Sequence, residues 1–342
     1  MKVLGIETSC DETSIAVVEA RAKGFHIAAH IVSSQMAHHS AYGGVVPEVA
    51  ARMHIEQLLP ILDSALGRAG VAAADCIAVT RGPGLITSLM VGVQIAKTLS
   101  YVLRKPLVGV NHLEGHVYAT WLTESQLFMN TKKFFPALAL IVSGGHTEIV
   151  LMRGHGIYEL IGQTVDDAAG EAFDKVAKIL ELGYPGGPII SKLARKGDPH
   201  AVDFPRPMLA SHDFNMSFSG LKTSVLYYLE RRKTVPKKML PDIAASFQQA
   251  VVDVLVAKLE RACVEYRPAS LILAGGVSAN DALRKEFTVV GRRQGVPVFM
   301  PALQYTGDNA AMIAAAGYFR RREATRDAWR SLSFDPQLPL AV

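Results

Sequence analysis

The sequence of 342 residues has little of what marks secreted or membrane proteins. Its three cysteines, Cys10, Cys76 and Cys263, are odd in number and far apart, which argues against a disulfide framework and against a cysteine metal cluster. The apolar run at the N-terminus is too short for a signal peptide. No run approaches the roughly 20 apolar residues that span a bilayer. We therefore expect a cytoplasmic protein without a membrane partner.

Charge of either sign is not in large excess. Lys and Arg total 36 and Asp and Glu total 31, which gives a net charge of +5. Charged residues make up 20% and apolar residues 49%, so disorder is not expected and two cores can be filled. Basic clusters are more often solubilising surfaces than nucleic-acid footprints, but together they leave binding of a large polyanion possible. They are Lys132-Lys133, Arg231-Arg232-Lys233 with Lys237-Lys238, and Arg320-Arg321-Arg322 with Arg326 and Arg330.

The two halves of the chain repeat one order of elements. A strand, a polar turn and a returning strand are expected at 2–19 and again at 137–152. A strand, a glycine turn and a helix follow at 77–90 and at 271–287. The repeat predicts an α/β fold of two duplicated domains facing a cleft, where ligands bind. We assign residues 1–135 and 308–342 to the first domain and 136–307 to the second.

Helical periodicity and capping residues predict the main helices, with an irregular stretch at 185–219. The expected helices cover 47–66, 85–103, 113–121, 165–182, 239–264, 278–293 and 310–322.

Two histidines follow the strand expected at 107–110. His112 and His116 are four apart, so on a helix they lie on one face and can offer two imidazole nitrogens to one metal ion. Spacing alone leaves two ordinary helix histidines equally open. Glu114 is rotated off their face, which makes it a poor general base for a zinc protease. Asp308 precedes the last helix, where it is either the helix cap or a third ligand. Two histidines and a carboxylate suit Fe(II), and also zinc.

Glycine turns are the candidate anion sites. Ser143-Gly144-Gly145-His146-Thr147 lets backbone N–H groups approach a phosphate, and the turn at 8–13 is its counterpart in the first half. Gly275-Gly276 joins a buried strand to a helix, where a sugar or base can approach. Asn280 lies in the first turn of that helix, although we expect Ser278 to be its cap.

Acidic residues after 163 have competing interpretations. Thr164-Val165-Asp166-Asp167 fits a capping box, so both aspartates are expected to be structural. Asp174 lies two turns further on. It belongs either to a solvated stripe, the more frequent case, or to a site that binds a ribose hydroxyl. The glycine-rich segment Tyr184–Pro188 just after the expected helix favours the second interpretation.

Seven motifs together resemble the TsaD family of tRNA N(6)-adenosine threonylcarbamoyltransferases, formerly described as glycoproteases. The resemblance runs from residue 2 to about 322 and implies the fold shared by actin, the heat-shock chaperone ATPases and sugar kinases (ASKHA). The motifs are Ile6-Glu7-Thr8-Ser9-Cys10-Asp11-Glu12-Thr13, Gly43-Gly44-Val45-Val46-Pro47-Glu48, Gly82-Pro83-Gly84-Leu85, Asn111-His112-Leu113-Glu114-Gly115-His116, Ser143-Gly144-Gly145-His146-Thr147, Asp166-Asp167-Ala168-Ala169-Gly170-Glu171-Ala172-Phe173-Asp174-Lys175 and Gly275-Gly276-Val277-Ser278-Ala279-Asn280.

The resemblance also implies site residues. His112, His116 and Asp308 would hold one divalent metal, Fe(II) or Zn. Threonylcarbamoyl-AMP or another adenine nucleotide would bind Ile141, Val142, Ser143, Gly144, Gly145, Asp174, Gly187 and Asn280, to which the turns above add His146 and Gly275. Gly307 departs from the family pattern, because a threonine is expected before the metal aspartate.

The implied reaction transfers a threonylcarbamoyl group to the exocyclic amine of the adenosine 3′ of the anticodon in tRNAs that decode ANN codons. Asp11 and Glu12 are the candidate catalytic carboxylates. The expected partners are tRNA and, as for bacterial members of the family, a paralogue (TsaB) and an ATPase (TsaE). Three alternatives remain: a small-molecule kinase, which has no need of the histidine pair; a chaperone-like module, which would need a client domain; and a metalloprotease, which needs a base beside the metal.

Overall fold

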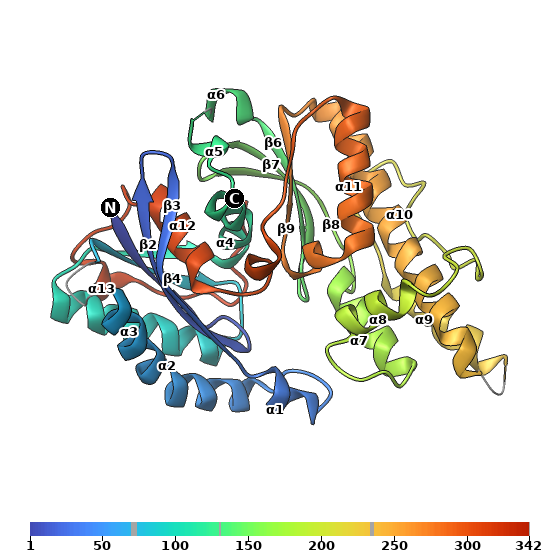
Figure 1. The fold of residues 1–342 in the computed structure, drawn as a ribbon, viewed down its shortest axis with the longest axis horizontal. Helices are drawn as coiled ribbons and strands as arrows, with labels where there is room; N and C mark the ends of the chain where they lie inside the picture. The colour runs from blue at the N-terminus through green and yellow to red at the C-terminus, as the bar shows by residue number, and fades with distance from the viewer. Residues whose placement is uncertain (70–73, 130, 233–235, 342) are drawn as a thin grey trace. The chain divides into compact units, whose positions relative to one another are not determined.

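A computed structural model describes residues 1–69, 74–129, 131–232 and 236–341. The chain divides into two compact units. Unit 1 comprises Met1–Phe134, Gly154–Tyr158 and Pro301–Val342, and unit 2 comprises Phe135–Arg153 and Glu159–Met300. Each unit contains one five-stranded sheet with helices (Figure 1).

The sheet of unit 1 has the order β3-β2-β1-β4-β5. The first three strands are antiparallel, whereas β4 and β5 run parallel to β1. The strands are β1 (Lys2–Glu7), β2 (Glu12–Arg21), β3 (Gly24–Ser34), β4 (Cys76–Gly82) and β5 (Leu107–Asn111). The helices are α1 (Met36–Ser40), α2 (Pro47–Ala69), α3 (Ile86–Leu103), α4 (His112–Tyr118), α5 (Gln126–Met129), α6 (Thr131–Phe134), α12 (Ala310–Phe319) and α13 (Ala328–Ser331), with short 3₁₀ turns η2 (Ala119–Leu122) and η5 (Leu303–Tyr305).

Helices cover both faces of this sheet (Figure 1). Side chains alternate between the faces of a strand, so Leu4 and Ile6 of β1 point one way, into a core that includes Leu58 of α2 and Val93 of α3. Gly5 points the other way, against α12, which is buried from Ala310 to Gly317. The small side chains of α12 allow this close approach. This helix therefore packs on the sheet of unit 1.

The sheet of unit 2 has the order β10-β9-β6-β7-β8, the same plan read from the opposite edge. Its first hairpin pairs antiparallel and its later strands run parallel to β6, as in unit 1. The predicted duplication and α/β class are therefore confirmed. The strands are β6 (Ala137–Val142), β7 (Thr147–Gly154), β8 (Ile157–Gln163), β9 (Ser270–Ala274) and β10 (Val298–Phe299). The helices are α7 (Ala169–Ile179), α8 (Gly186–Ala194), α9 (Ser219–Glu230), α10 (Leu240–Tyr266) and α11 (Asp281–Gln294), with η3 (Lys237–Met239) and η4 (Gly276–Ala279).

The stretch 185–219, expected to be irregular, contains a complete helix, α8. Its sequence begins Gly186-Gly187-Pro188, which usually marks a loop. All three residues lie in the first turn, where backbone N–H groups have no intrahelical partner, so a proline there costs little. The helix α9 was also not predicted, and the helix expected at 165–182 is shorter, covering only Ala169–Ile179.

Two helices are long and apolar enough to cross a membrane by length and composition. They cover Ile86–Leu103 and Lys237–Tyr266. Each packs within its own unit: α3 contacts β4 and α2, and α10 contacts α8 and α11. A core helix of a globular domain passes the same test, so this packing accounts for their apolar composition.

Candidate metal centre and ligand pocket

The two histidines lie at the start of α4, directly after β5. The Asn111 side chain accepts hydrogen bonds from the backbone N–H groups of Leu113 and Glu114, which fixes the start of the helix at His112. His116 then lies one turn further on the same face. Their rings are 4.7 Å apart between centroids, and both residues are buried.

Asp308 brings the third ligand-type atom. Its Oδ1 lies 3.4 Å from Nε2 of His112 and 3.1 Å from Nε2 of His116. Capping would have been another explanation for this residue, but the cap of α12 is Asn309, whose side chain accepts from the N–H of Met312 at 3.0 Å. One ligand atom from each of His112, His116 and Asp308 lies within 4.8 Å of the others, so these three residues could hold a metal ion.

The hydrogen bonding of His116 fits a metal ligand. Neither ring nitrogen of this buried residue makes a hydrogen bond among the described residues, although Nε2 is close to Asp308. A buried polar atom without a partner is costly, and coordination of a cation would satisfy it. Burial opposes the charged form of Asp308, yet the neighbouring histidines lower its pKa, so it is a carboxylate. Two nitrogens and one carboxylate oxygen are donors that Fe(II) and Zn accept.

The opposite side of the His112 ring faces a buried carboxylate. Its Nδ1 lies 3.1 Å from Oε2 of Glu7 and 3.1 Å from Oγ of Ser9. Burial alone would lower the pKa of His112, but Asp308 and Glu7 outweigh it and raise the pKa. The imidazole is therefore held between two carboxylates.

Asp11 and Glu12, the candidate catalytic carboxylates, lie in the turn between β1 and β2 and at the first residue of β2. Burial, followed by the charges of Asp308 and Asp11, raises the pKa of Glu12 to about 10. The Ser34 hydroxyl donates to Oε1 of Glu12 at 3.2 Å. Glu12 thus interacts electrostatically with Asp308, and Asp11 interacts with Glu12.

Glu114 is buried and is directed to other partners. Its Oε2 accepts a short hydrogen bond from Nε of Arg320, and its Oε1 accepts from the hydroxyl of Tyr158 at 3.1 Å. Burial raises the pKa of Glu114, although Arg320 opposes this. Its carboxylate is engaged by these two side chains, so the expectation that Glu114 is badly placed as a metal-site base agrees with the structure.

Unit 2 contains a pocket of about 420 Å³. Of the predicted ligand-binding residues, Gly144, Asp174, Gly187 and Asn280 line it. The other predicted residues do not line this pocket, and Ile141 and Val142 lie inside the buried strand β6. Gly275 has a positive φ of 88°, and a Cβ there would meet the carbonyl oxygen of Val142, so its role is to turn the chain. The lining residues are Gly144, Gly170, Phe173, Asp174, Gly187, Pro188, Ser191, Lys192, Arg195, Gly276, Val277, Ala279 and Asn280.

Two pocket residues also hold the local structure together. Oδ1 of Asp174 accepts from the N–H of Gly186 at 2.7 Å, which joins α7 to the start of α8. Asn280, not Ser278 as we expected, caps α11 by accepting from the N–H of Leu283, and its amide donates to Gln248 at 2.7 Å. Asn280 is the better cap because it lies directly before α11, whereas Ser278 lies inside η4.

The expected capping box at 164–167 is wrong for α7, since that helix begins at Ala169. Oδ1 of Asp166 instead accepts from the N–H groups of Phe218 and Ser219 at the start of α9. Asp167 forms ion pairs with Lys175 and Lys222, both at 2.7 Å. Both aspartates are structural, as expected, but they connect α7 to α9.

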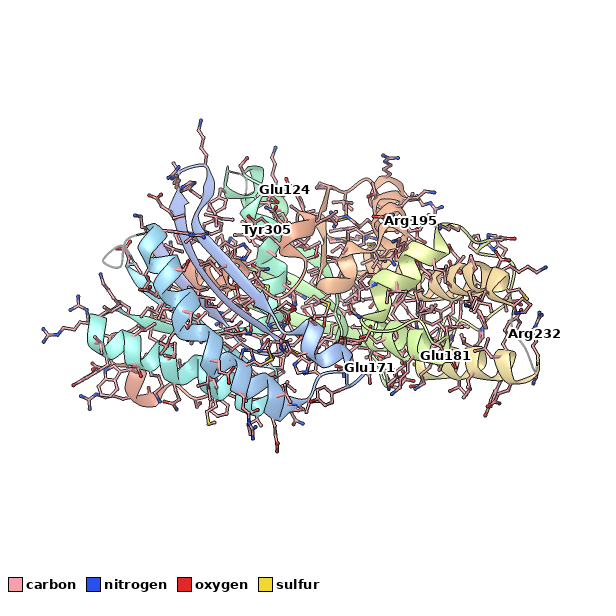
Figure 2. All side chains as sticks on the ribbon, turned by 60° about the horizontal axis from the view of Figure 1, so that its bottom comes forward. Glu124, Glu171, Glu181, Arg195, Arg232 and Tyr305 are labelled. Atoms are coloured by element: carbon pink, nitrogen blue, oxygen red, sulfur yellow. The ribbon has the colours of Figure 1, made fainter. Side chains whose placement is uncertain are left out.

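Sequence reasoning missed the wall that α8 contributes. Gly187, Ser191 and Arg195 are spaced by four and line the pocket from one side. That spacing was visible in the sequence, but it could be interpreted only if the segment was known to be helical. Arg195, labelled in Figure 2, forms an ion pair with Asp281 at the start of α11.

Comparison with known proteins gives one consistent result. The family model described as TsaD, tRNA N6-adenosine threonylcarbamoyltransferase, matches residues 26–315. Proteins of that name are 51% identical over 318 residues in Carboxydothermus hydrogenoformans, covering 93% of this chain and 92% of the relative. They are 48% identical in Moorella thermoacetica (99% and 97% covered) and 48% identical in Bacillus subtilis (96% and 93% covered).

Solved structures resemble the fold at low sequence identity. The HypF protein of T. kodakarensis matches with a TM-score of 0.62 at 14% identity, covering 95% of this chain. A full-length HypF in a phosphate- and nucleotide-bound form matches with a TM-score of 0.59 at 12% identity, covering 94%. This chain spans about half the length of those proteins, 49% and 46%. Because the sequence identity is low, these matches support the fold alone.

Proposed function

Since the chain belongs to the tRNA N6-adenosine threonylcarbamoyltransferase family and is a transferase, we propose that it modifies tRNAs that decode ANN codons. The group transferred is threonylcarbamoyl. Its donor is threonylcarbamoyl-AMP, and its acceptor is the exocyclic amine of the adenosine 3′ of the anticodon.

The observation that best supports the proposal is the group of His112, His116 and Asp308, which could hold a metal ion. A transferase that acts on an activated acyl donor can use a cation bound at this group. A bound Fe(II) or Zn ion would supply Lewis-acid polarisation and orientation of the threonylcarbamoyl oxygens. The chain itself contributes the ligands: α4 positions the two buried histidines, and Asp308, which is partly exposed, directly precedes Asn309, the cap of α12.

The pocket of unit 2 is the proposed place of the adenylate. Gly144, Gly187 and Gly276 leave room for a ligand, and Lys192 and Arg195 bring positive charge that suits a phosphate. In the reaction the amine nitrogen forms a bond to the carbamoyl carbon, the bond from that carbon to the phosphate oxygen breaks, and AMP leaves. The amine loses a proton in the same process.

Asp11 and Glu12 are the proposed acceptors of that proton. The pKa of about 10 for Glu12 rests on its burial and on the negative charges of Asp308 and Asp11. A cation on Asp308 would offset one of those charges and so favour the carboxylate form that can accept a proton. Replacement of either acid should therefore lower the turnover more than the binding of the donor.

The remaining proposals concern the partners. The anticodon loop presents its bases unpaired, so the target amine is accessible without opening a duplex. Parts of the basic clusters are already engaged: Arg320 binds Glu114, and Arg232, which is labelled in Figure 2, lies over the ring of Tyr228. Lys233 lies outside the described residues. We propose a cytoplasmic enzyme that works with TsaB-like and TsaE-like proteins.

The direct test is to incubate the protein and its helper proteins with synthetic threonylcarbamoyl-AMP and an ANN-decoding tRNA, and then to digest the tRNA to nucleosides. Threonylcarbamoyladenosine is the expected product. His116→Ala should lose the product together with the bound metal, whereas His26→Ala, a change at an exposed histidine of β3, should keep both. Release of AMP without the modified nucleoside would indicate hydrolysis, and the transferase proposal would be withdrawn.

A further inference from the structure

Glu7 is a fully buried carboxylate at the last position of β1. Its Oε1 accepts from the backbone N–H of Ser9 at 2.5 Å. Its Oε2 accepts from the hydroxyl of Thr80 at 2.7 Å and lies 3.1 Å from Nδ1 of His112. Among the described residues, these contacts include no Lys or Arg. A buried negative charge is costly, and here only hydrogen bonds and the imidazole stabilise it.

The sheet order brings these groups together. In unit 1, β1 pairs with β4, and β4 pairs with β5, all in parallel. Parallel strands end at the same edge of a sheet, so Glu7 at the end of β1 lies beside Thr80 of β4 and beside His112, the first residue after β5. Thr80 and Ser9 donate to the carboxylate and thus hold it in one orientation.

We propose that Glu7 is a positioning residue for the metal ligand His112. An ionised carboxylate only accepts hydrogen bonds, so the contact at 3.1 Å requires the proton of the neutral imidazole to be on Nδ1. Nε2 then presents its lone pair on the side of the ring where Asp308 lies, 3.4 Å away. The Ser9 hydroxyl, also 3.1 Å from Nδ1, accepts from the same N–H. A carboxylate that orients a ligating histidine in this way increases metal affinity. The inference rests on the proposed cation site.

The variant Glu7→Gln keeps the size of the side chain and removes its charge. Its amide can donate to Nδ1 and so favour the tautomer with the proton on Nε2, which cannot bind a cation. Glu114→Gln is the matched control, because Glu114 is equally buried and lies between the two histidines in sequence, yet its carboxylate contacts Arg320 and Tyr158. The probe is Co²⁺, added to metal-free protein in competition with a chelator, with its visible absorption spectrum recorded.

Glu7→Gln should weaken Co²⁺ binding by about 10- to 100-fold and change the Co²⁺ spectrum, while Glu114→Gln leaves both near wild type. In the background of His112→Ala, adding Glu7→Gln should have no further effect on the affinity, because the ligand that it orients is gone. An equal loss in both backgrounds would indicate a purely structural role and overturn the inference.

Two further outcomes are decisive. Wild-type affinity in Glu7→Gln would overturn the role of Glu7 and leave the cation site intact, whereas a wild-type protein that binds no Co²⁺, Fe(II) or Zn would remove the cation site itself. If Glu7→Gln does not fold, Glu7→Asp takes its place, with the carboxylate withdrawn from His112. It should weaken Co²⁺ binding only when His112 is present, and equal weakening without His112 would overturn the inference.

Discussion

At the residue scale, the pKa values of two histidines of unit 1, His112 and His155, are shifted in opposite directions. His112 lies between carboxylates, which raise its pKa. At His155, desolvation, with a smaller effect of Arg321, lowers the pKa to about 4. It is stacked on Phe319 at 4.1 Å between ring centroids, and Nδ1 lies 2.9 Å from the hydroxyl of Tyr118. His155 is therefore neutral in the folded protein.

This predicts a specific loss of stability in acid. Between pH 6.5 and about 4 the unfolded chain binds a proton at His155 that the folded chain does not, so stability falls as the pH falls through that window. The ring is partly exposed, so we expect a contribution of about 1–3 kcal/mol. Thermal midpoints measured from pH 7 to pH 4 should decline less in His155→Phe than in wild type. His200→Phe, at an exposed histidine, should follow wild type, and an unchanged decline in His155→Phe would contradict the assignment.

A second prediction concerns Gly187, the second residue of α8. A Cβ built there meets no atom within 4 Å, and the residue lines the pocket of unit 2. Gly187→Val should therefore occupy space that the adenylate needs and raise the Kd for AMP about fivefold or more, without lowering the thermal midpoint. Gly67→Val, at another open glycine but in unit 1, is the control. If calorimetry gave the same Kd for AMP in Gly187→Val as in wild type, the nucleotide would bind elsewhere.

The sequence predicted which residue types gather at each site better than the role of each residue. His112 and His116 could be paired from their spacing, since a helix places residues four apart on one face. Asp308 is almost 200 positions away in the sequence, and its residue type left it open between helix cap and third ligand until the family resemblance favoured the ligand. The sequence analysis favoured Ser278 over Asn280 as the cap of α11, and it did not identify Asn309 as the cap of α12. The cap is the residue directly before the first residue of the helix, and sequence patterns locate helix ends poorly.

At the scale of elements, the contact between β1 and α12 depends on small side chains. A Cβ at Gly5 would lie 2.1 Å from the carbonyl oxygen of Ala310 and 2.9 Å from the backbone nitrogen of Ala314, and neither backbone atom can move without shifting the helix. Gly5→Ala should lower the free energy of unfolding by about 2 kcal/mol or more. Gly67→Ala in α2, where the new methyl group meets nothing, should raise it by about 0.5–1 kcal/mol.

Denaturant titration of both variants measures the difference. Because α12 follows directly after Asp308, Gly5→Ala should also weaken metal binding, whereas Gly67→Ala should not. A stable Gly5→Ala protein with full metal affinity would show that this helix does not position the ligand.

At the scale of the whole molecule, the duplication could be predicted because its signals are local. Each half contains a strand, a polar turn and a returning strand, followed by a strand, a glycine turn and a helix. Both units show the expected order of elements along the chain, and their two sheets have the same strand order. The wall that α8 contributes to the pocket could not be predicted, because Pro185-Gly186-Gly187-Pro188 carries the local signal of a loop. Packing of Ile190 and Ala194 in the core of unit 2 decides the structure of that segment, and such packing is not visible in a short window of sequence.

The outer surface of α2 and α3 provides the last prediction. Ile55, Leu59 and Met90 are 63%, 59% and 44% exposed, and with neighbouring residues they line a groove of about 370 Å³ in unit 1. Exposed apolar side chains gathered on one surface are typical of a protein interface. We propose that this surface binds the TsaB-like paralogue.

Leu59→Asp should raise the Kd for the paralogue roughly tenfold or more, because the interface would have to desolvate a charge. Its thermal midpoint should remain near wild type, since Leu59 is exposed in the isolated chain. Val264→Asp, at a residue of α10 in unit 2 that is 67% exposed, tests whether any added surface charge has this effect, and it should leave binding unchanged. Sedimentation of each variant with the paralogue gives the affinity. Normal assembly of the Leu59→Asp protein would place the partner on another surface of the chain.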